Sequence, residues 1–184
     1  SLTLRVLALT LAVGAPLACK KEASKPPPAE AKPADDGYDY AAMVADPVAD
    51  EASALSEGPL AQRAASDAPG RAFVGDLIAG SLSPGEEIDQ EFTIDPARCY
   101  TLIAVGGEGV VEVEAAITTV APVRGGETTL AEDAERGAVA VIGGGEACYR
   151  GGETRTPARF VLRVSEGAGV VVGQLYASEA PPVD

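Results

Sequence analysis

Three cysteines, Cys19, Cys99 and Cys148, are the residues of this chain whose type and position most clearly point to chemistry. The sequence contains no histidine, which excludes the Ser-His-Asp and Cys-His arrangements of nucleophilic catalysis. Zinc sites that use imidazole are excluded as well, and three cysteines are too few for an all-cysteine tetrahedral site. The cysteines are therefore expected to serve in cross-linking or in modification.

Cys99 and Cys148 are each followed by tyrosine. An even number of cysteines in an exported domain predicts a disulfide, because the cell envelope is oxidising. A disulfide between them would close a loop of about 50 residues and stabilise the folded protein by about 4 kcal/mol in the chain-entropy model. Two buried free thiols, or reactive or metal-binding thiols, are the alternatives; the Cys-x-x-Cys pattern of redox pairs is absent.

Two acidic clusters could supply oxygen ligands to calcium. One consists of Glu86, Glu87, Asp89 and Glu91, and the other of Glu132, Asp133 and Glu135. A solvated charged face that keeps a sheet soluble explains the same residues, and no Asp-x-Asp-x-Asp-Gly loop occurs. Paired carboxylates could also hydrolyse glycosides, but aromatic residues that would line a sugar cleft make up only 4% of the chain. No metal site is therefore assigned.

Four arginines lie close together in the sequence and could face an acidic ligand, or else pair with the surplus carboxylates: Arg150, Arg155, Arg159 and Arg163. The glycine runs match neither the phosphate-binding P-loop nor the dinucleotide-binding pattern, so no cofactor is expected. The net charge of −14 and the lack of tryptophan argue against nucleic acid as a partner, because phosphate contacts need basic clusters and base stacking needs aromatic side chains.

Residues 1–18 have the pattern of a signal peptide. Arg5 precedes the uncharged apolar stretch 6–18, which is shorter than the ~20 residues of a membrane-spanning helix. The end of this stretch, Pro16-Leu17-Ala18-Cys19, resembles the lipobox of bacterial lipoproteins. This resemblance implies cleavage before Cys19 and acylation of its sulfur. An ordinary signal peptide with a chance cysteine, or a fragment of a buried helix, is the alternative.

Residues 19–71 are predicted to be a largely disordered tether. Pro26-Pro27-Pro28 favours an extended spacer, and an Ala-, Asp- and Pro-rich stretch follows. A brief helix near residues 50–56 or 60–65 is the alternative. Lys20, rather than Asp, beside the lipidated cysteine resembles the pattern of lipoproteins sorted to the outer membrane.

Residues 72–178 predict an antiparallel β-sandwich of about seven or eight short strands, and 179–184 form a C-terminal tail. Apolar and polar residues alternate along Ile88–Ile94 and Phe160–Val164, and residues 99–105 are apolar on both faces, which predicts a central strand. We expect hairpin turns at 106–109 and 166–169 and a polar loop over 121–137. The segments 102–113 and 161–172 echo each other, as a true repeat or because Val- and Gly-rich hairpins converge.

This succession resembles the bacterial pre-peptidase C-terminal β-sandwich family. The resemblance rests on the turn Gly80-Ser81-Leu82-Ser83-Pro84-Gly85, on Phe92, and on the late strands from Phe160 to Tyr176. It implies a non-catalytic accessory module over about residues 73–178.

The sequence as a whole predicts a non-catalytic lipoprotein anchored in the cell envelope, on the periplasmic side or the surface of the outer membrane. Its sandwich would bind an envelope protein or glycan, or have a structural role. A calcium- or glycan-binding module and a hydrolase with paired carboxylates are the alternatives.

Overall fold

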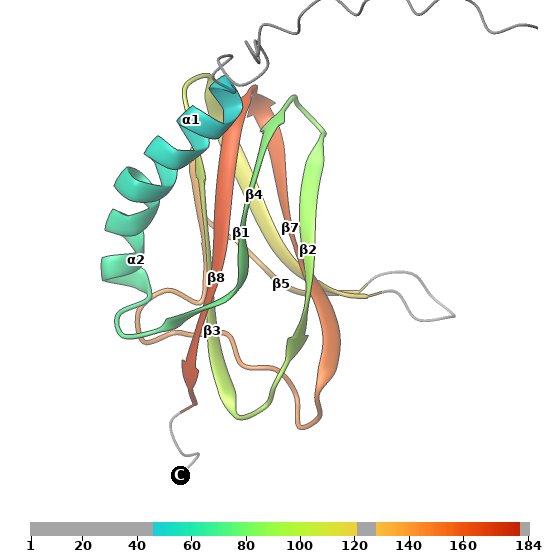
Figure 1. Ribbon diagram of the computed structural model, residues 1–184. Helices are drawn as coiled ribbons and strands as arrows, with labels where there is room; N and C mark the ends of the chain where they lie inside the picture. The colour runs from blue at the N-terminus through green and yellow to red at the C-terminus, as the bar shows by residue number, and fades with distance from the viewer. Residues whose placement is uncertain (1–45, 121–127, 181–184) are drawn as a thin grey trace, which may run out of the picture. The chain divides into compact units, whose positions relative to one another are not determined.

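The computed structural model describes residues 46–120 and 128–180 (Figure 1). It contains the helices α1 (Pro47–Leu55) and α2 (Ala61–Asp67), joined by the π-helical segment η2 (Ser56–Leu60), followed by eight strands. The strands are β1 (Ala72–Leu82), β2 (Glu87–Ile94), β3 (Arg98–Gly106), β4 (Val110–Thr119), β5 (Thr129–Glu132), β6 (Val139–Ile142), β7 (Thr156–Gly167) and β8 (Gly169–Glu179). The predicted signal peptide, Cys19, the tether up to residue 45 and the last four residues of the tail lie outside the described residues.

The strands form two antiparallel four-stranded sheets. Sheet A has the order β1-β8-β3-β6 and sheet B the order β2-β7-β4-β5. Apolar side chains from both sheets meet in one core, whose fully buried members include Leu102, Leu162 and Phe160. Burying a side chain of this size contributes about 1.5–3 kcal/mol. The predicted all-β sandwich is confirmed.

Consecutive strands are shared between the sheets in a regular way. In each of the pairs β1–β2, β3–β4, β5–β6 and β7–β8, one strand belongs to sheet A and the other to sheet B. The turns 106–109 and 166–169 therefore cross from one sheet to the other, and the prediction that they close hairpins is wrong. Alternation of apolar residues shows that a strand has a buried face, but it does not identify the neighbouring strand.

The two crossing turns lie against each other. The N–H of Ala168 donates to the carbonyl of Gly109 at 2.9 Å, and Gly109 and Gly167 have φ of 87° and 84°, which favour glycine. The segments that echo each other in the sequence thus form neighbouring arches, with β3 beside β8 and β4 beside β7. The loop predicted over 121–137 contains the short strand β5, which pairs with β4.

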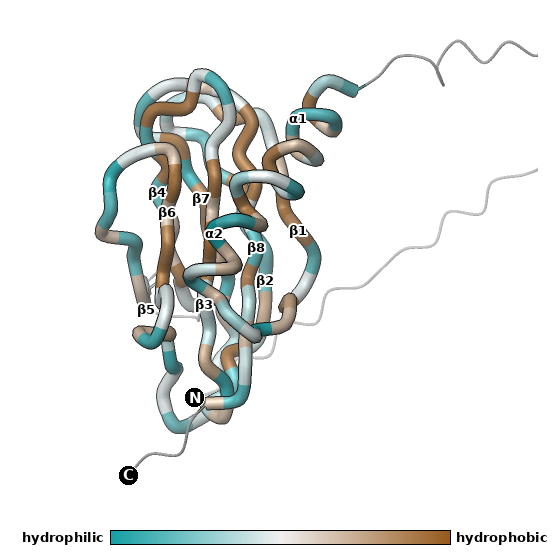
Figure 2. The backbone as a smooth tube through the Cα atoms, turned by 90° about the vertical axis from the view of Figure 1, so that its left-hand side faces the viewer, coloured by the Kyte–Doolittle hydropathy of each residue, from teal (hydrophilic) through white to brown (hydrophobic). Residues whose placement is uncertain are grey.

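A helical segment covers the outer face of sheet A, and the prediction of a largely disordered tether is wrong for residues 47–67. The carboxylate of Asp46 caps α1 by accepting from the Val48 N–H at 3.0 Å, and Pro47 occupies the first turn. Pro59, which has no N–H to donate, lies in the π-helical segment. Figure 2 shows this segment, called here the helical cover, in front of the apolar strands of sheet A.

The helical cover packs on sheet A through apolar side chains, several of them alanines. Ala52, Leu60 and Ala68 are buried in a second apolar cluster, with Val48, Leu55 and Ala64 partly buried against it, and sheet A contributes Ile103, Val105, Val170, Val172 and Tyr176. Low aromatic content, recurring proline and acidic runs favoured disorder here, but the alternative of brief helices near residues 50–56 and 60–65 agrees with α1 and α2. Alanine is nevertheless a strong helix former, and its small side chain lets the helix lie close to the sheet. The outer face of β3, which the sequence shows to be apolar, is therefore buried by residues from the predicted tether.

Candidate functional site

The outer face of sheet B forms a concave, charged surface. No described helix lies over this face (Figure 1). Its hollow has a volume of about 750 Å³ and is lined mainly by carboxylates and by three arginines, Arg136, Arg159 and Arg163. We call this surface the charged groove. Because it combines both signs of charge in one hollow, it is suited to a polar ligand rather than to an apolar one.

Strand register explains how the charged groove is built. Side chains that alternate with the buried residues of β2, β7 and β4 point outward, so charged residues on neighbouring strands form rows. In one row, Arg163 of β7 lies between Glu87 of β2 and Glu114 of β4. In another, Arg159 lies between Glu91 and Thr118. Opposite charges at paired positions stabilise an antiparallel sheet by a few tenths of a kcal/mol each.

Several contacts hold the groove's side chains in place. A guanidinium nitrogen of Arg159 lies 3.7 Å from a carboxylate oxygen of Asp89. The carboxylate of Glu112 accepts from the Gly137 N–H at 2.8 Å, and that of Asp133 accepts from the Val141 N–H at 3.0 Å. Burial raises the pKa of Asp133, although the hydrogen bond from Val141 opposes this change. Asp133 is thus a partly desolvated carboxyl group at the margin of the groove.

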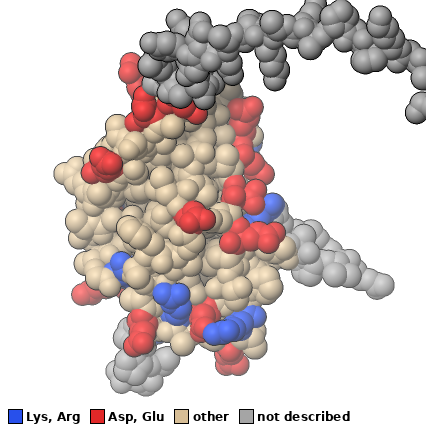
Figure 3. Space-filling model, in the orientation of Figure 1, with Lys and Arg blue, Asp and Glu red and all other residues tan. Residues whose placement is uncertain are grey.

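A second, mostly apolar groove lies between the helical cover and β1. Its volume is about 890 Å³, and its lining includes Leu60, Ala64, Phe73 and Leu77. Phe73 is 72% exposed and its ring stacks at a tilt on that of Tyr176, with 5.3 Å between the centroids. In the space-filling view, uncharged side chains make up most of the upper visible face, with an isolated acidic group near the middle, and acidic side chains gather along the right margin (Figure 3).

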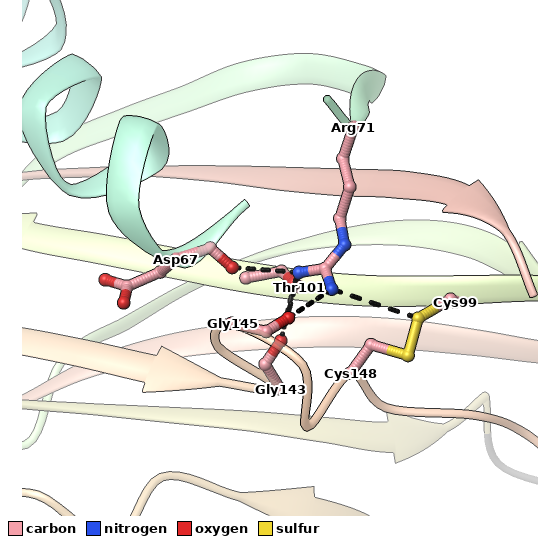
Figure 4. Close-up of a disulfide and its surroundings, with 7 residues drawn as sticks. All are labelled: Asp67, Arg71, Cys99, Thr101, Gly143, Gly145 and Cys148. Atoms are coloured by element: carbon pink, nitrogen blue, oxygen red, sulfur yellow. Dashed lines mark hydrogen bonds between the residues drawn. A yellow bond between two sulfur atoms is a disulfide. The ribbon is translucent and has the colours of Figure 1, made fainter. Parts of the chain in front are cut away.

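The disulfide lies at the C-terminal end of the helical cover. Cys99 of β3 and Cys148 are joined, with 5.4 Å between their Cα atoms, as their positions in the sequence predicted. The half-buried guanidinium of Arg71 lies beside them (Figure 4). It donates to the carbonyls of Asp67 at 2.8 Å and Gly145 at 2.5 Å. Sequence reasoning gave Arg71 no role, because a single arginine next to a glycine carries no motif.

Arg71 has further partners in the same place. It donates to the hydroxyl of Thr101, which is fully buried and itself donates to the carbonyl of Gly143 at 2.6 Å. One of its nitrogens lies 4.0 Å from the sulfur of Cys99. Burial lowers the pKa of the Arg71 guanidinium, which stays cationic, as arginine does in proteins. A partly buried cation of this kind is stabilised by the several oxygen acceptors around it.

The four arginines singled out in the sequence do not share one face. Arg159 and Arg163 line the charged groove, whereas Arg155 pairs with Asp95 at 2.6 Å outside it. Arg136, which the sequence analysis did not single out, joins the groove from the segment between β5 and β6. Side chains alternate between the two faces of a strand, so the sequence alone places Arg159 and Arg163 on the same face of β7.

The two predicted acidic clusters lie in different places. Glu87, Asp89 and Glu91 lie at alternate positions along β2, whereas Glu132, at the end of β5, and the following Asp133 and Glu135 all line the charged groove. Within residues 46–120 and 128–180, no three Asp, Glu or Cys side chains are grouped closely enough to hold a metal ion. Cys19, the predicted lipidation site, is outside the described residues.

Comparison of the sequence with models of known families and with curated proteins returns no match. None of the helices in the described part of the chain has the length and apolarity needed to cross a membrane.

Proposed function

We propose that this protein is a lipoprotein of the cell envelope whose β-sandwich is a non-catalytic binding or structural module. The observation that carries the proposal is the succession of Arg5, a short apolar stretch and Leu17-Ala18-Cys19. Acylation of Cys19 would anchor the chain, and the Pro-rich residues after it would act as a spacer. The accessory character of the sandwich is proposed from the sequence pattern of the turn Gly80–Gly85, Phe92 and the late strands, which no family model matches.

Two features of the described residues support export and binding. A disulfide between Cys99 and Cys148 suits an oxidising compartment. The charged groove offers arginine and carboxylate side chains over one open sheet face, which suits an envelope protein or glycan that presents polar groups. The lack of histidine removes the commonest proton-transfer group of enzymes from this surface.

The anchor is tested by comparing the full chain with its Cys19→Ser variant after membrane fractionation. We expect the parent protein in the membrane fraction and the variant in the aqueous fraction, because serine cannot form the thioether on which lipoprotein anchoring depends. Lys20→Ser is the matched control, since it introduces the same residue one position later and leaves Cys19 in place. It should remain with the membrane.

Intact mass spectrometry of the membrane-extracted parent protein provides the second measurement. Its mass should correspond to a chain that begins at Cys19, carries acyl groups and has lost two hydrogens to the disulfide. A Cys19→Ser variant that stays in the membrane fraction would contradict the proposal. A parent chain that retains residues 1–18 without added lipid would contradict it equally.

A further inference from the structure

The helical cover packs on sheet A along its whole length through apolar side chains, but its polar contacts with the sandwich lie mainly at its C-terminal end. Ala52, Leu60 and Ala68 are buried in the apolar cluster, and Val48, Leu55 and Ala64 are partly buried against it. Gly58 and Pro59, both poor helix formers, lie at the centre of the cover, and a helix of this length is marginal without tertiary support. Near the N-terminal end, the carboxylate of Glu51 accepts from the Glu108 N–H at 3.3 Å, in an exposed position. The stronger polar contacts of the cover are therefore those at its C-terminal end.

The C-terminal end of the cover rests on the loop that contains Gly143 and Gly145. The N–H of Gly145 donates to the carbonyl of Asp67, the last residue of α2, at 2.8 Å. Arg71 donates to that same carbonyl and to the carbonyls of Gly143 and Gly145. A charged donor shared among these carbonyls is stronger than neutral hydrogen bonds of the same number. The end of α2 and this loop thus form one polar joint.

The disulfide fixes the loop of this joint to sheet A. Tyr149, next to Cys148, exchanges two backbone hydrogen bonds with Tyr100 of β3, at 2.8 and 2.9 Å. The Cys99–Cys148 bond fixes the loop to β3 one residue away, beside the guanidinium of Arg71. Without it, the segment 143–148 would lose its covalent attachment to β3, and Arg71 would lose the fixed positions of its carbonyl acceptors.

We propose that the Cys99–Cys148 disulfide and Arg71 together form a latch that holds the helical cover on sheet A, and that reduction of the disulfide releases the cover. A dithiol would supply two electrons and two protons, leaving two cysteine thiols in the protein and becoming a disulfide itself. Release exposes the outer face of sheet A, where Ile103, Val105, Val172 and Tyr176 form an apolar surface. The inference concerns the sandwich and does not depend on the proposed lipid anchor.

Hydrogen exchange with mass spectrometry of the full chain tests the latch, with dithiothreitol as the reductant. Reduction should speed exchange in peptides from residues 47–67 by about tenfold or more, because the cover loses charge-assisted hydrogen bonds. Peptides from β4 and β7, in sheet B, should stay protected over the times at which the reduced cover exchanges, because their exchange requires the whole sandwich to open. Unchanged exchange in the cover, or exchange of the cover and sheet B at the same rate after reduction, would overturn the proposal.

The Arg71→Ala variant tests the same latch while the disulfide stays intact. Coupling between the cover and the disulfide is reciprocal in free energy, so loss of the guanidinium should both speed exchange in the cover and let the disulfide be reduced at a lower equilibrium ratio of reduced to oxidised dithiothreitol. The Arg163→Ala variant removes an arginine from the opposite sheet and should change neither the exchange rate of the cover nor this ratio. If Arg71→Ala leaves both at the parent values, the latch is not built as proposed.

Discussion

Replacing Gly173 by alanine should destabilise the sandwich through one contact between its sheets. Gly173 lies in β8, and a Cβ atom there would overlap the Cδ1 atom of Leu162, in β7 of the other sheet. It would also lie 3.4 Å from the Cγ atom of Leu162 and 3.5 Å from the carbonyl oxygen of Ile103. Leu162 is fully buried, so its side chain has little room to turn away.

Packing energies give the expected change in the free energy of unfolding for each variant. Overpacking of a core by one methyl group costs about 1–3 kcal/mol, and Leu162→Ala alone should cost about 2–5 kcal/mol. In the double variant, the new methyl group occupies part of the space that Leu162 leaves. The double variant should therefore lose less unfolding free energy than the sum of the losses in the two single variants, by about 1 kcal/mol or more.

Urea unfolding with the disulfide intact measures the free energy of unfolding of each variant. The values can be compared when the slope of this free energy against urea concentration is the same in all variants. Gly152→Ala is the matched control, because a Cβ at Gly152 would meet no atom within 4 Å. It should change stability by less than about 0.5 kcal/mol. A Gly173→Ala variant as stable as this control, or single effects that simply add, would refute the contact and the sheet packing from which it is derived.

Two further predictions concern polar groups. Tyr100→Phe should cost about 1–2 kcal/mol in urea unfolding, because the buried hydroxyl accepts from the Asp95 N–H at 2.8 Å and its loss leaves that donor unsatisfied; stability equal to the parent would contradict this. Asp133→Asn should raise the melting temperature at pH 7, since burial raises the pKa of Asp133 and so disfavours its charged form in the folded protein. Its amide oxygen can still accept from the Val141 N–H, and the gain should vanish as the pH falls below 3.8, the ordinary pKa of the group. A gain that is the same at acidic and neutral pH would show that charge is not its cause.

The two outer faces of the sandwich differ in what lies over them. Sheet A carries the helical cover on an apolar face, whereas sheet B presents the charged groove. The proposed partner would bind at sheet B while the cover is latched. Reduction of the disulfide would add a second, apolar surface on the other side.

The sequence by itself determined most of the strands, β5 excepted, and which of their side chains point inward. Alternation along β2 and β7 predicted their buried faces, and the two apolar faces of β3 predicted its central position. The pairing of Cys99 with Cys148 was also predictable, because the sandwich contains only these two cysteines. These properties depend on local period and residue type, which a single chain displays directly.

Tertiary structure decided which strands are neighbours and what covers sheet A. Alternation along a strand is the same whether its turn closes a hairpin or crosses between sheets, so the arches formed by β3–β4 and β7–β8 could not be distinguished from hairpins. An Ala-rich segment of this length forms a stable helix only when it packs on another surface, here the outer face of sheet A. Composition alone does not show that this surface is present. For the same reason the role of Arg71 emerged only when the end of α2, the loop at Gly143–Gly145 and the disulfide were brought together in space.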